Sequence, residues 1–238
     1  MVQAGRSRIL LDCGFGLGDT VSRLSRLGLE PRDLDAIVVT HEHEDHIGGV
    51  ARLARRFELP VWLTHGTLTA FEALFSEVHA RVIENYSVFH VGDVEVIPFP
   101  VPHDAREPAQ FVFCDGLRRL GVLTDAGATT PHIERMLSGC DALVLECNHD
   151  PDMLQESNYP QSVKERIAGR HGHLDNRTAA RLLARLDCSR LQRLVAAHLS
   201  QQNNRPELAR AALAEVLGND ERIGIADQDQ GFDWVTLD

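Results

Sequence analysis

Residues 40–46, Thr-His-Glu-His-Glu-Asp-His, hold three histidines and three acidic residues within seven positions. They follow the apolar, strand-like residues 36–39 and precede the pair Gly48-Gly49. Imidazole nitrogens and carboxylate oxygens are ligands that divalent metal ions bind in proteins. Side chains that leave the end of one buried strand can converge on one point, and a merely solvated loop seldom carries ligands at this density. The stretch therefore predicts a metal centre.

Three more polar residues stand just beyond apolar, strand-like runs: His103, Asp125 and His198. One histidine in such a place is more often a structural residue than a metal ligand. Here all three occur together with the histidine-rich residues 40–46, and a metal site needs ligands from several strand ends. We therefore predict that these three residues contribute to the same centre.

The strands and helices that must position these residues follow from apolar periodicity. The expected strands are residues 8–12, 35–40, 61–64, 111–114, 120–124, 142–146, 191–197, 224–226 and 232–237. The expected helices are residues 19–27, 47–57, 68–75, 161–168, 176–186 and 206–217. Alternation over residues 88–99 predicts a hairpin about Gly92-Asp93. Together these elements predict an α/β fold with two sheets packed face to face and helices outside.

Length and composition favour one domain. The chain has 238 residues, of which 43% are hydrophobic, and neither a linker nor an internal repeat divides it. We therefore expect residues 1–238 to form a single domain. No run approaches the length of a membrane span, and the start lacks the pattern of a signal peptide. An odd number of cysteines, 5, argues against a disulfide framework and predicts a cytoplasmic location.

Charge is unevenly distributed along the chain. The net charge of −11 argues against a protein that coats nucleic acid non-specifically. Basic residues nevertheless gather between positions 160 and 193, and Arg177, Arg181 and Arg185 recur every four residues on one expected helix. This stripe is either a solvated face or a track for phosphates. In the second case Arg177 and Arg181 are candidate substrate contacts.

Taken as a series, Asp12, residues 41–46, His103, Asp125 and His198 resemble the ligand motif of the metallo-β-lactamase-fold hydrolases. The resemblance extends over nearly the whole chain. It implies the αββα four-layer sandwich of that fold and two bound divalent metal ions, Zn²⁺ or Mn²⁺. Such a pair of ions can lower the pKa of a water molecule and stabilise the oxygens of a transferring phosphoryl group.

The same resemblance implies a role for each residue of the series. The ligands implied for the first ion are His41, His43 and His103. The ligands implied for the second ion are Asp45, His46 and His198. Asp125 would bind both ions, and Asp12 would orient the ligands without binding an ion. Redox-active di-iron members of the fold usually carry glutamate where His43 stands, so the resemblance favours hydrolysis over electron transfer.

The second half of the chain resembles the phosphodiesterase branch of this fold. In that branch a His-x-Thr motif opens a helix before the last metal histidine, and its histidine pairs with an upstream glutamate at the scissile phosphate. His173 and Glu146 stand at the matching positions, although Asp175 replaces the threonine. The resemblance thus implies catalytic roles for His173, Glu146 and Asp45. His149, close to Glu146 in the sequence, is a candidate substrate contact.

More specifically, the chain resembles the bacterial cytoplasmic hydrolases of the YycJ/WalJ type, which are exonuclease-like. The matching pieces are residues 146–150, 159–160, 172–176, 198–200 and 203–204. That family begins with a strand and a Ser-Gly-Ser-x-Gly-Asn loop ahead of the stretch that matches residues 2–14. We therefore expect that the first strand of the fold is missing at this N-terminus.

These observations predict a dinuclear metal-dependent hydrolase acting on phosphodiesters, with DNA favoured over RNA as substrate and 5′-to-3′ exonuclease-like action. A first alternative is a small-molecule hydrolase of thioesters, lactones or cyclic phosphodiesters, which the acidic net charge favours and the arginine-rich helix disfavours. A second is a non-catalytic nucleic-acid-binding module, which the intact ligand set disfavours. No membrane partner is expected, and the sequence predicts no particular oligomeric state.

Overall fold

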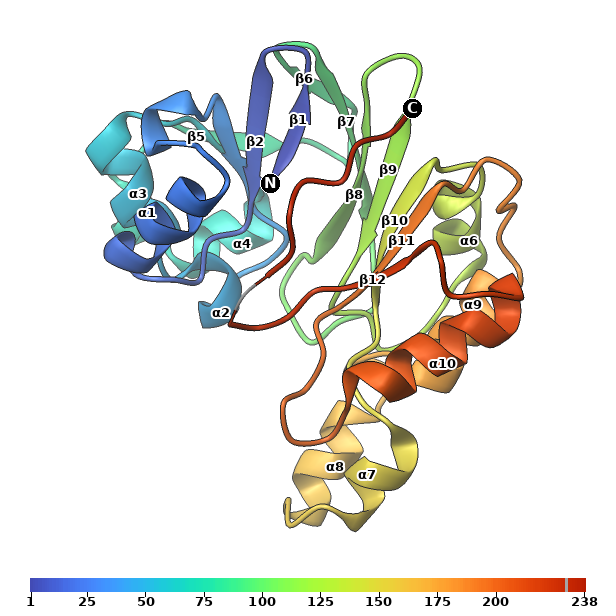
Figure 1. Ribbon diagram of the computed structural model, residues 1–238. Coiled ribbons are helices and arrows are strands. Elements are labelled where there is room, and N and C mark those ends of the chain that lie inside the picture. Colours follow the sequence, from blue (N-terminus) through green and yellow to red (C-terminus); the bar gives the residue numbers. More distant parts are fainter. Residues whose placement is uncertain (230) are drawn as a thin grey trace. The chain divides into compact units, whose positions relative to one another are not determined.

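The computed structural model describes every residue of the chain except residue 230 (Figure 1). The chain divides into two compact units. The first unit comprises Met1–Pro100 and Ala105–Leu117, and the second comprises Val101–Asp104 and Arg118–Asp238. The expectation of a single domain over residues 1–238 stays a prediction.

The first unit contains a five-stranded sheet with the order β1-β2-β3-β4-β5. Its strands are β1 (Val2–Ala4), β2 (Ser7–Leu11), β3 (Ala36–Val38), β4 (Val61–Thr64) and β5 (Ala80–Ile83). β1 and β2 are antiparallel, and all other neighbours are parallel. The central strand β3 is completely buried, as expected of an apolar parallel strand. The histidine-rich residues 40–46 follow it almost directly.

Helices and a second group of strands complete the first unit. The helices are α1 (Leu17–Arg26), α2 (Glu44–Ile47), α3 (Val50–Phe57), α4 (His65–Ala70) and α5 (Glu72–Phe75), with a 3-10 helix at Pro31–Asp33. The strands β6 (Phe89–Val91), β7 (Val94–Pro100) and β8 (Ala109–Cys114) pair antiparallel in this order. The turn between β6 and β7 has Gly92 at a φ of 56°, so the predicted hairpin is confirmed.

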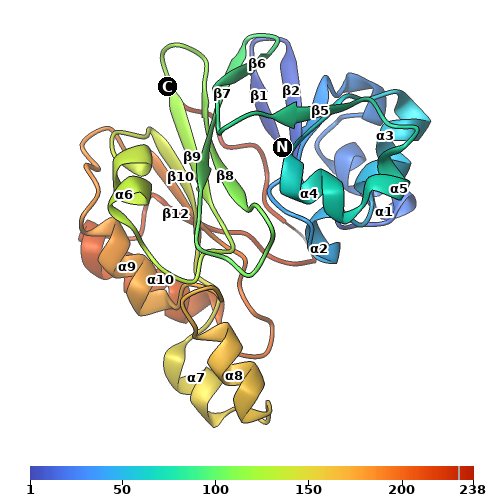
Figure 2. The ribbon, with the colours of Figure 1, turned by 180° about the vertical axis from the view of Figure 1, so that it is seen from behind.

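The second unit is built on four parallel strands in the order β12-β11-β10-β9. These are β9 (Arg119–Leu123), β10 (Ala142–Glu146), β11 (Arg193–Ala197) and β12 (Ile223–Ile225). The helices that connect them, as parallel strands require, are α6 (Pro131–Leu137), α7 (Pro151–Glu156), α8 (Gln161–Ile167), α9 (Asn176–Leu183) and α10 (Pro206–Leu217). In both views α7 and α8 form a pair that projects from the sheet, and α9 lies beside α10 (Figure 1, Figure 2).

Three predicted elements differ from the structure. Residues 232–237 form no strand, and the side chains of Phe232, Trp234 and Val235 are exposed rather than packed in a core. The helix expected from residue 47 begins at Val50, because the Gly49 amide donates to the Cys13 carbonyl (2.7 Å) and interrupts the preceding helical turn. The helix expected at residues 68–75 is two short helices, separated at Phe71, whose φ of −131° lies outside the helical range.

The sequence reasoning also missed β1, β5, α6 and α7. Both helices begin with a capping residue followed by proline, a start signal that the sequence displays. The Thr130 side chain accepts from the Ile133 amide before Pro131, and the Asp150 side chain accepts from two amides after Pro151. Each helix is too short, at 7 and 6 residues, for its apolar periodicity to stand out. Among the described residues, no helix is both long enough and apolar enough to cross a bilayer.

Candidate functional site

Each unit carries its own cluster of the predicted residues at the ends of its strands. In the first unit, β2 ends just before Asp12, and β3 leads through Thr40 into the histidine-rich run. In the second unit, Glu146 is the last residue of β10 and His198 directly follows β11. Parallel strands bring their carboxyl ends to the same edge of a sheet, which explains how residues far apart in sequence meet there.

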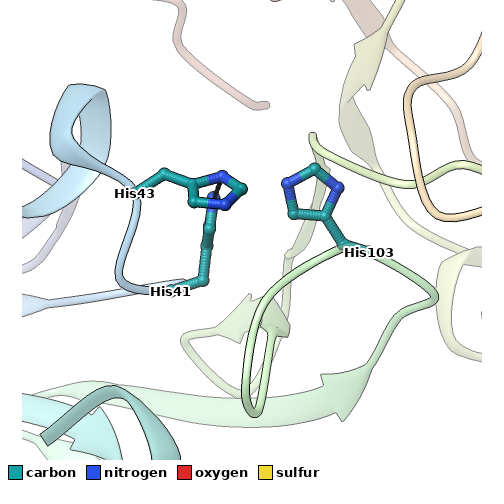
Figure 3. A group of neighbouring side chains, drawn as sticks. All are labelled: His41, His43 and His103. Carbon is teal, nitrogen blue, oxygen red and sulfur yellow. Dashed lines mark hydrogen bonds between the residues drawn. The ribbon is translucent and has the colours of Figure 1, made fainter. Parts of the chain in front are cut away.

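His41 and His43 form the first pair of candidate ligands. Their rings meet edge to face, with centroids 4.5 Å apart and an interplanar angle of 79°. Nε2 of His41 lies 2.9 Å from Nδ1 of His43 (Figure 3). Two ring nitrogens at this separation can both reach one ion, because a zinc–nitrogen bond is about 2.0–2.1 Å long. Figure 3 also labels His103, which belongs to the second unit.

Asp12 organises the rest of the cluster in the first unit. Its carboxylate accepts hydrogen bonds from the Thr40 amide (2.8 Å), the Thr40 hydroxyl (2.8 Å) and Nδ1 of His46 (2.9 Å). Because the Thr40 hydroxyl donates to Asp12, its oxygen accepts from Nδ1 of His41 at 2.9 Å. Both His41 and His46 therefore carry their proton on Nδ1, and Nε2 holds the lone pair that a metal ligand needs. Asp45 lies nearby, with a carboxylate oxygen 3.5 Å from Nε2 of His46.

Asp125 lies at the centre of the cluster in the second unit. Its Oδ1 atom is 3.7 Å from Nε2 of His103, 3.5 Å from Nδ1 of His173 and 3.6 Å from Nδ1 of His198. Asp125 is buried, although His173 and His198 remain partly accessible. A buried carboxylate among three imidazoles is a donor set that suits a divalent cation.

Glu146 lies behind these histidines and is completely buried. Its Oε1 atom accepts from Nδ1 of His173 (2.9 Å) and Nδ1 of His198 (3.0 Å), and Oε2 accepts from the amides of Ala126 and Leu174 (3.0 Å each). Burial by itself raises the pKa of this carboxyl, but the hydrogen bonds and charges of the two histidines outweigh it and hold the pKa below its usual range. Glu146 thus fixes the protonated nitrogen of both histidines.

His103 is oriented by the backbone instead of a carboxylate. Its Nδ1 atom donates to the Gly172 carbonyl (3.1 Å), so Nε2 carries the lone pair. Burial lowers the pKa of His103 and keeps the imidazole neutral, the form that binds a metal. In each unit the side chains therefore fit divalent ions. An acceptor within the protein holds the proton of these imidazoles on Nδ1, which leaves the lone pair of Nε2 for a metal.

Three of the predicted site residues have unusual backbone conformations. Asp12, Asp125 and His198 have φ angles of 55°, 50° and 58°, in the left-handed region that residues other than glycine seldom adopt. Such conformations persist only where the surrounding structure enforces them, and they concentrate at functional sites. The backbone thus turns sharply at each of these three strand ends.

Several residues that support the site were missed by sequence reasoning. Thr40 links Asp12 to His41, and the peptide of Gly172 packs so closely on Gly127 that a Cβ atom there would lie 2.4 Å from the Gly172 nitrogen. Asn176 and Asn204 exchange two hydrogen bonds between their buried amides, of 2.8 and 2.9 Å. The only signal for Thr40 was its place between a strand and the histidines. Asn176 and Asn204 belong to the stretches 172–176 and 203–204 that match the YycJ/WalJ type, but nothing in the sequence indicated that they pair across 28 positions.

The predicted substrate contacts lie on the surface or in the interior of the second unit. Arg177 binds Asp152, and Arg181 donates to the Thr178 hydroxyl. His149 is buried, and burial lowers its pKa. Their role as substrate contacts stays a prediction.

Comparisons with known proteins identify the family. Residues 7–199 match the model of a beta-lactamase superfamily domain. The chain belongs to this superfamily. An exodeoxyribonuclease YycJ from Bacillus anthracis is 36% identical over 219 residues, which cover 91% of this chain and 83% of the relative. An exodeoxyribonuclease WalJ from Streptococcus pneumoniae is 29% identical over 242 residues, which cover 100% of this chain and 88% of the relative.

A solved structure extends the likeness to the fold. The metallo-beta-lactamase fold protein YhfI from Bacillus subtilis has a TM-score of 0.73 and 19% identity, covering 98% of this chain and 89% of that one. The predicted fold class is therefore confirmed, and so is the predicted class of metal-dependent hydrolase. In this beta-lactamase superfamily member, the fold and the histidine–aspartate clusters together indicate divalent metal binding.

Proposed function

We propose that this superfamily member is an exodeoxyribonuclease that hydrolyses phosphodiester bonds of DNA in the 5′-to-3′ direction in the cytoplasm. The observation that carries the proposal is the 36% identity to an exodeoxyribonuclease over 91% of the chain. The arrangement of Asp125, Glu146, His173 and His198 supports it, because one polar side-chain atom of each lies within 4.8 Å of the others and a proposed ligand, an orienting carboxylate and a proton-transferring histidine are thereby brought together.

The proposed cofactor is a pair of divalent ions, Zn²⁺ or Mn²⁺. The proposed ligands of one ion are His41, His43 and His103. Those of the other are Asp45, His46 and His198, and Asp125 is proposed to bind both. When bound, such ions supply Lewis-acid activation of water and stabilise negative charge on the reacting phosphate. Their charge also attracts the anionic substrate to a chain whose net charge is −11.

We propose that His173 transfers a proton at the scissile phosphate. Its Nδ1 atom is held by Glu146 at 2.9 Å, which fixes the orientation of the ring and leaves Nε2 to exchange a proton with the leaving oxygen. The His173 side chain is partly exposed, so a substrate can reach it, whereas Glu146 is completely buried and acts through the histidines that it holds. Asp45 has the most exposed carboxylate of the set, at 71%, and is proposed to accept the proton of the attacking water.

One observation favours a second candidate, a hydrolase of small molecules such as thioesters, lactones or cyclic phosphodiesters. Arg177, Arg181 and Arg185 all have partners within the chain: Asp152, Thr178 and Glu134. Arg177 and Arg185, which are bound to carboxylates, neutralise less phosphate charge than free arginines would, so this stripe supports a long nucleic-acid track less than the sequence predicted.

The two candidate functions differ in their substrates. The test therefore measures the rate of hydrolysis of end-labelled DNA, end-labelled RNA, a thioester and a lactone, each in the presence of Zn²⁺ and of Mn²⁺. The proposal expects DNA shortened from the 5′ end, at a rate well above that for the other substrates. Asp45→Ala should abolish cleavage while DNA still binds, and Asp19→Ala, an exposed aspartate on α1, should behave like the wild type. Turnover of a thioester or lactone without cleavage of DNA would overturn the proposal.

A further inference from the structure

An exposed aromatic ring lies beside the histidine-rich loop of the first unit. Phe15 follows β2 in the segment Gly14-Phe15-Gly16-Leu17-Gly18, and 45% of the residue is exposed. The guanidinium carbon of Arg23, on α1, lies 4.0 Å from the centre of the Phe15 ring. Neither feature is explained by the core of the first unit, because the exposed ring adds little to its packing.

Backbone contacts hold the segment around Phe15 against the loop that carries the candidate ligands. The Cys13 amide donates to the His46 carbonyl (2.7 Å), and the Gly49 amide donates to the Cys13 carbonyl (2.7 Å). At Gly14 a Cβ atom would lie 1.9 Å from the Asp45 carbonyl oxygen, so only glycine permits this approach. Phe15 is therefore one residue away from a direct backbone contact with Asp45.

The backbone that follows Phe15 is open to solvent. A Cβ atom added at Gly16 or Gly18 would meet no atom within 4 Å apart from the residues next to it in the chain. An exposed aromatic ring with a fixed backbone can stack on a nucleobase at low entropic cost, and a guanidinium on the ring adds a positive charge for a nearby phosphate.

We propose that Phe15 and Arg23 form a stacking subsite for a nucleobase of the DNA substrate, next to the histidine-rich loop. The inference rests on the proposed nuclease function. It adds a contact to a base, whereas the metal ligands and His173 act on the phosphate. Stacking does not require a particular base, so the subsite gives affinity without sequence preference.

The test compares Phe15→Leu, which keeps an apolar side chain but removes the ring, with Phe15→Trp, which enlarges it. The measurement is the Kd of the metal-loaded enzyme for a labelled single-stranded oligonucleotide with phosphorothioate linkages that slow hydrolysis. We expect Phe15→Leu to weaken binding by at least about fivefold, and Phe15→Trp to bind at least as tightly as the wild type. A second oligonucleotide of equal length, made only of abasic nucleotides, should bind the wild type and Phe15→Leu equally.

Phe57→Leu is the control for loss of an arginine-covered ring elsewhere in the first unit, because Arg56 lies over the Phe57 ring, at 5.5 Å, at the opposite end of α3 from the histidine-rich loop. Phe57 is partly buried against the core, so thermal unfolding should first show that this variant is folded. This variant should bind both oligonucleotides like the wild type. If the wild type cleaves DNA but Phe15→Leu binds the base-containing oligonucleotide normally, or weakens both oligonucleotides alike, the stacking subsite is wrong and the nuclease proposal stands. If the wild type neither binds nor cleaves DNA, both proposals are wrong.

Discussion

In the first unit, Asp12 accepts hydrogen bonds from one histidine and from Thr40, and 16% of its side chain is exposed. In the second unit, Glu146 accepts hydrogen bonds from two histidines and is completely buried. Both carboxylates have the same task, which is to keep a proton on Nδ1 of a candidate ligand or catalytic histidine. They differ in how easily water could take over their hydrogen bonds if the carboxylate were removed. The depth of the orienting carboxylate, and not only its contacts, should therefore set how much each site depends on it.

The largest effect is expected for Glu146→Gln. Both carboxylate oxygens of Glu146 accept, one from His173 and His198 and the other from the amides of Ala126 and Leu174, so the NH2 group of a glutamine would face donors in either orientation. The two imidazoles then either lose their common acceptor or are displaced with the loops that carry them, which disturbs the orientation of the metal ligands. We expect metal content and the rate of DNA cleavage to fall by about 100-fold, the upper part of the range for groups that orient metal ligands. Metal analysis of the purified protein and initial rates measure both.

Glu134→Gln is the matched control for this change, since Glu134 lies in the same unit and its surface ion pair with Arg185 should contribute little. It should retain both metal and activity. A Glu146→Gln enzyme with normal metal content and normal rate would show that the buried carboxylate does not set the proton positions of the two histidines.

A smaller loss is expected for Asp12→Asn. The asparagine oxygen can still accept from the Thr40 amide, but the new amide group replaces the oxygen that accepts from the Thr40 hydroxyl and from His46. His46 is therefore affected directly and His41 through Thr40, although water can enter beside this partly exposed side chain and replace part of the lost contacts. We expect a loss of about 10-fold in the same two measurements, the lower part of that range. Asp35→Asn serves as the control, because Asp35 likewise accepts a backbone amide, from Arg8, but contacts no histidine. Equal losses for Asp12→Asn and Glu146→Gln would remove burial as the explanation of the difference.

The smallest effect on catalysis is expected for Asn204→Leu. This variant tests whether the hydrogen bonds of the buried asparagine pair hold the loops of the second unit together. Asn204 donates to the Cys147 carbonyl (2.7 Å), directly after Glu146, and pairs with Asn176 near His173. Removing one member leaves buried polar groups unpaired, which should lower the free energy of unfolding by about 1–3 kcal/mol and the rate by a few-fold at most. Urea unfolding and initial rates provide the two values.

Asn203→Leu makes the same substitution at the neighbouring buried residue, whose Oδ1 atom has no hydrogen-bond partner among the described residues. It should lower stability less than Asn204→Leu does. The reverse order would mean that the asparagine pair does not hold these loops together.

The sequence was informative about ligands and less so about what orients them. Strand ends followed by histidine or aspartate can be recognised locally, so His103, Asp125 and His198 could be named without coordinates. The contacts of Asp12 with Thr40, 28 positions away, and of Asn204 with Cys147, 57 positions away, depend on how the loops fold. Their residue types occur in many loops, so no local pattern distinguishes them.

The same limit applies to the elements of the fold. The strands at residues 61–64 and 142–146 and the helix at 206–217 were predicted with their observed bounds, because each has a clear apolar pattern. The strand expected at residues 232–237 has such a pattern too, yet its side chains stay exposed, since a pattern does not show whether a partner strand is present.

The positive φ angles of Asp12, Asp125 and His198 have a consequence for any attempt to make this protein more heat-resistant. Glycine at these three positions would relieve a conformational cost of roughly 1 kcal/mol each. It would also leave buried partners such as Thr40, His46 and Glu146 without their hydrogen bonds, which costs about 1–3 kcal/mol for each group. These three strand ends are therefore poor places to seek heat resistance by glycine substitution, although their φ angles suggest the opposite.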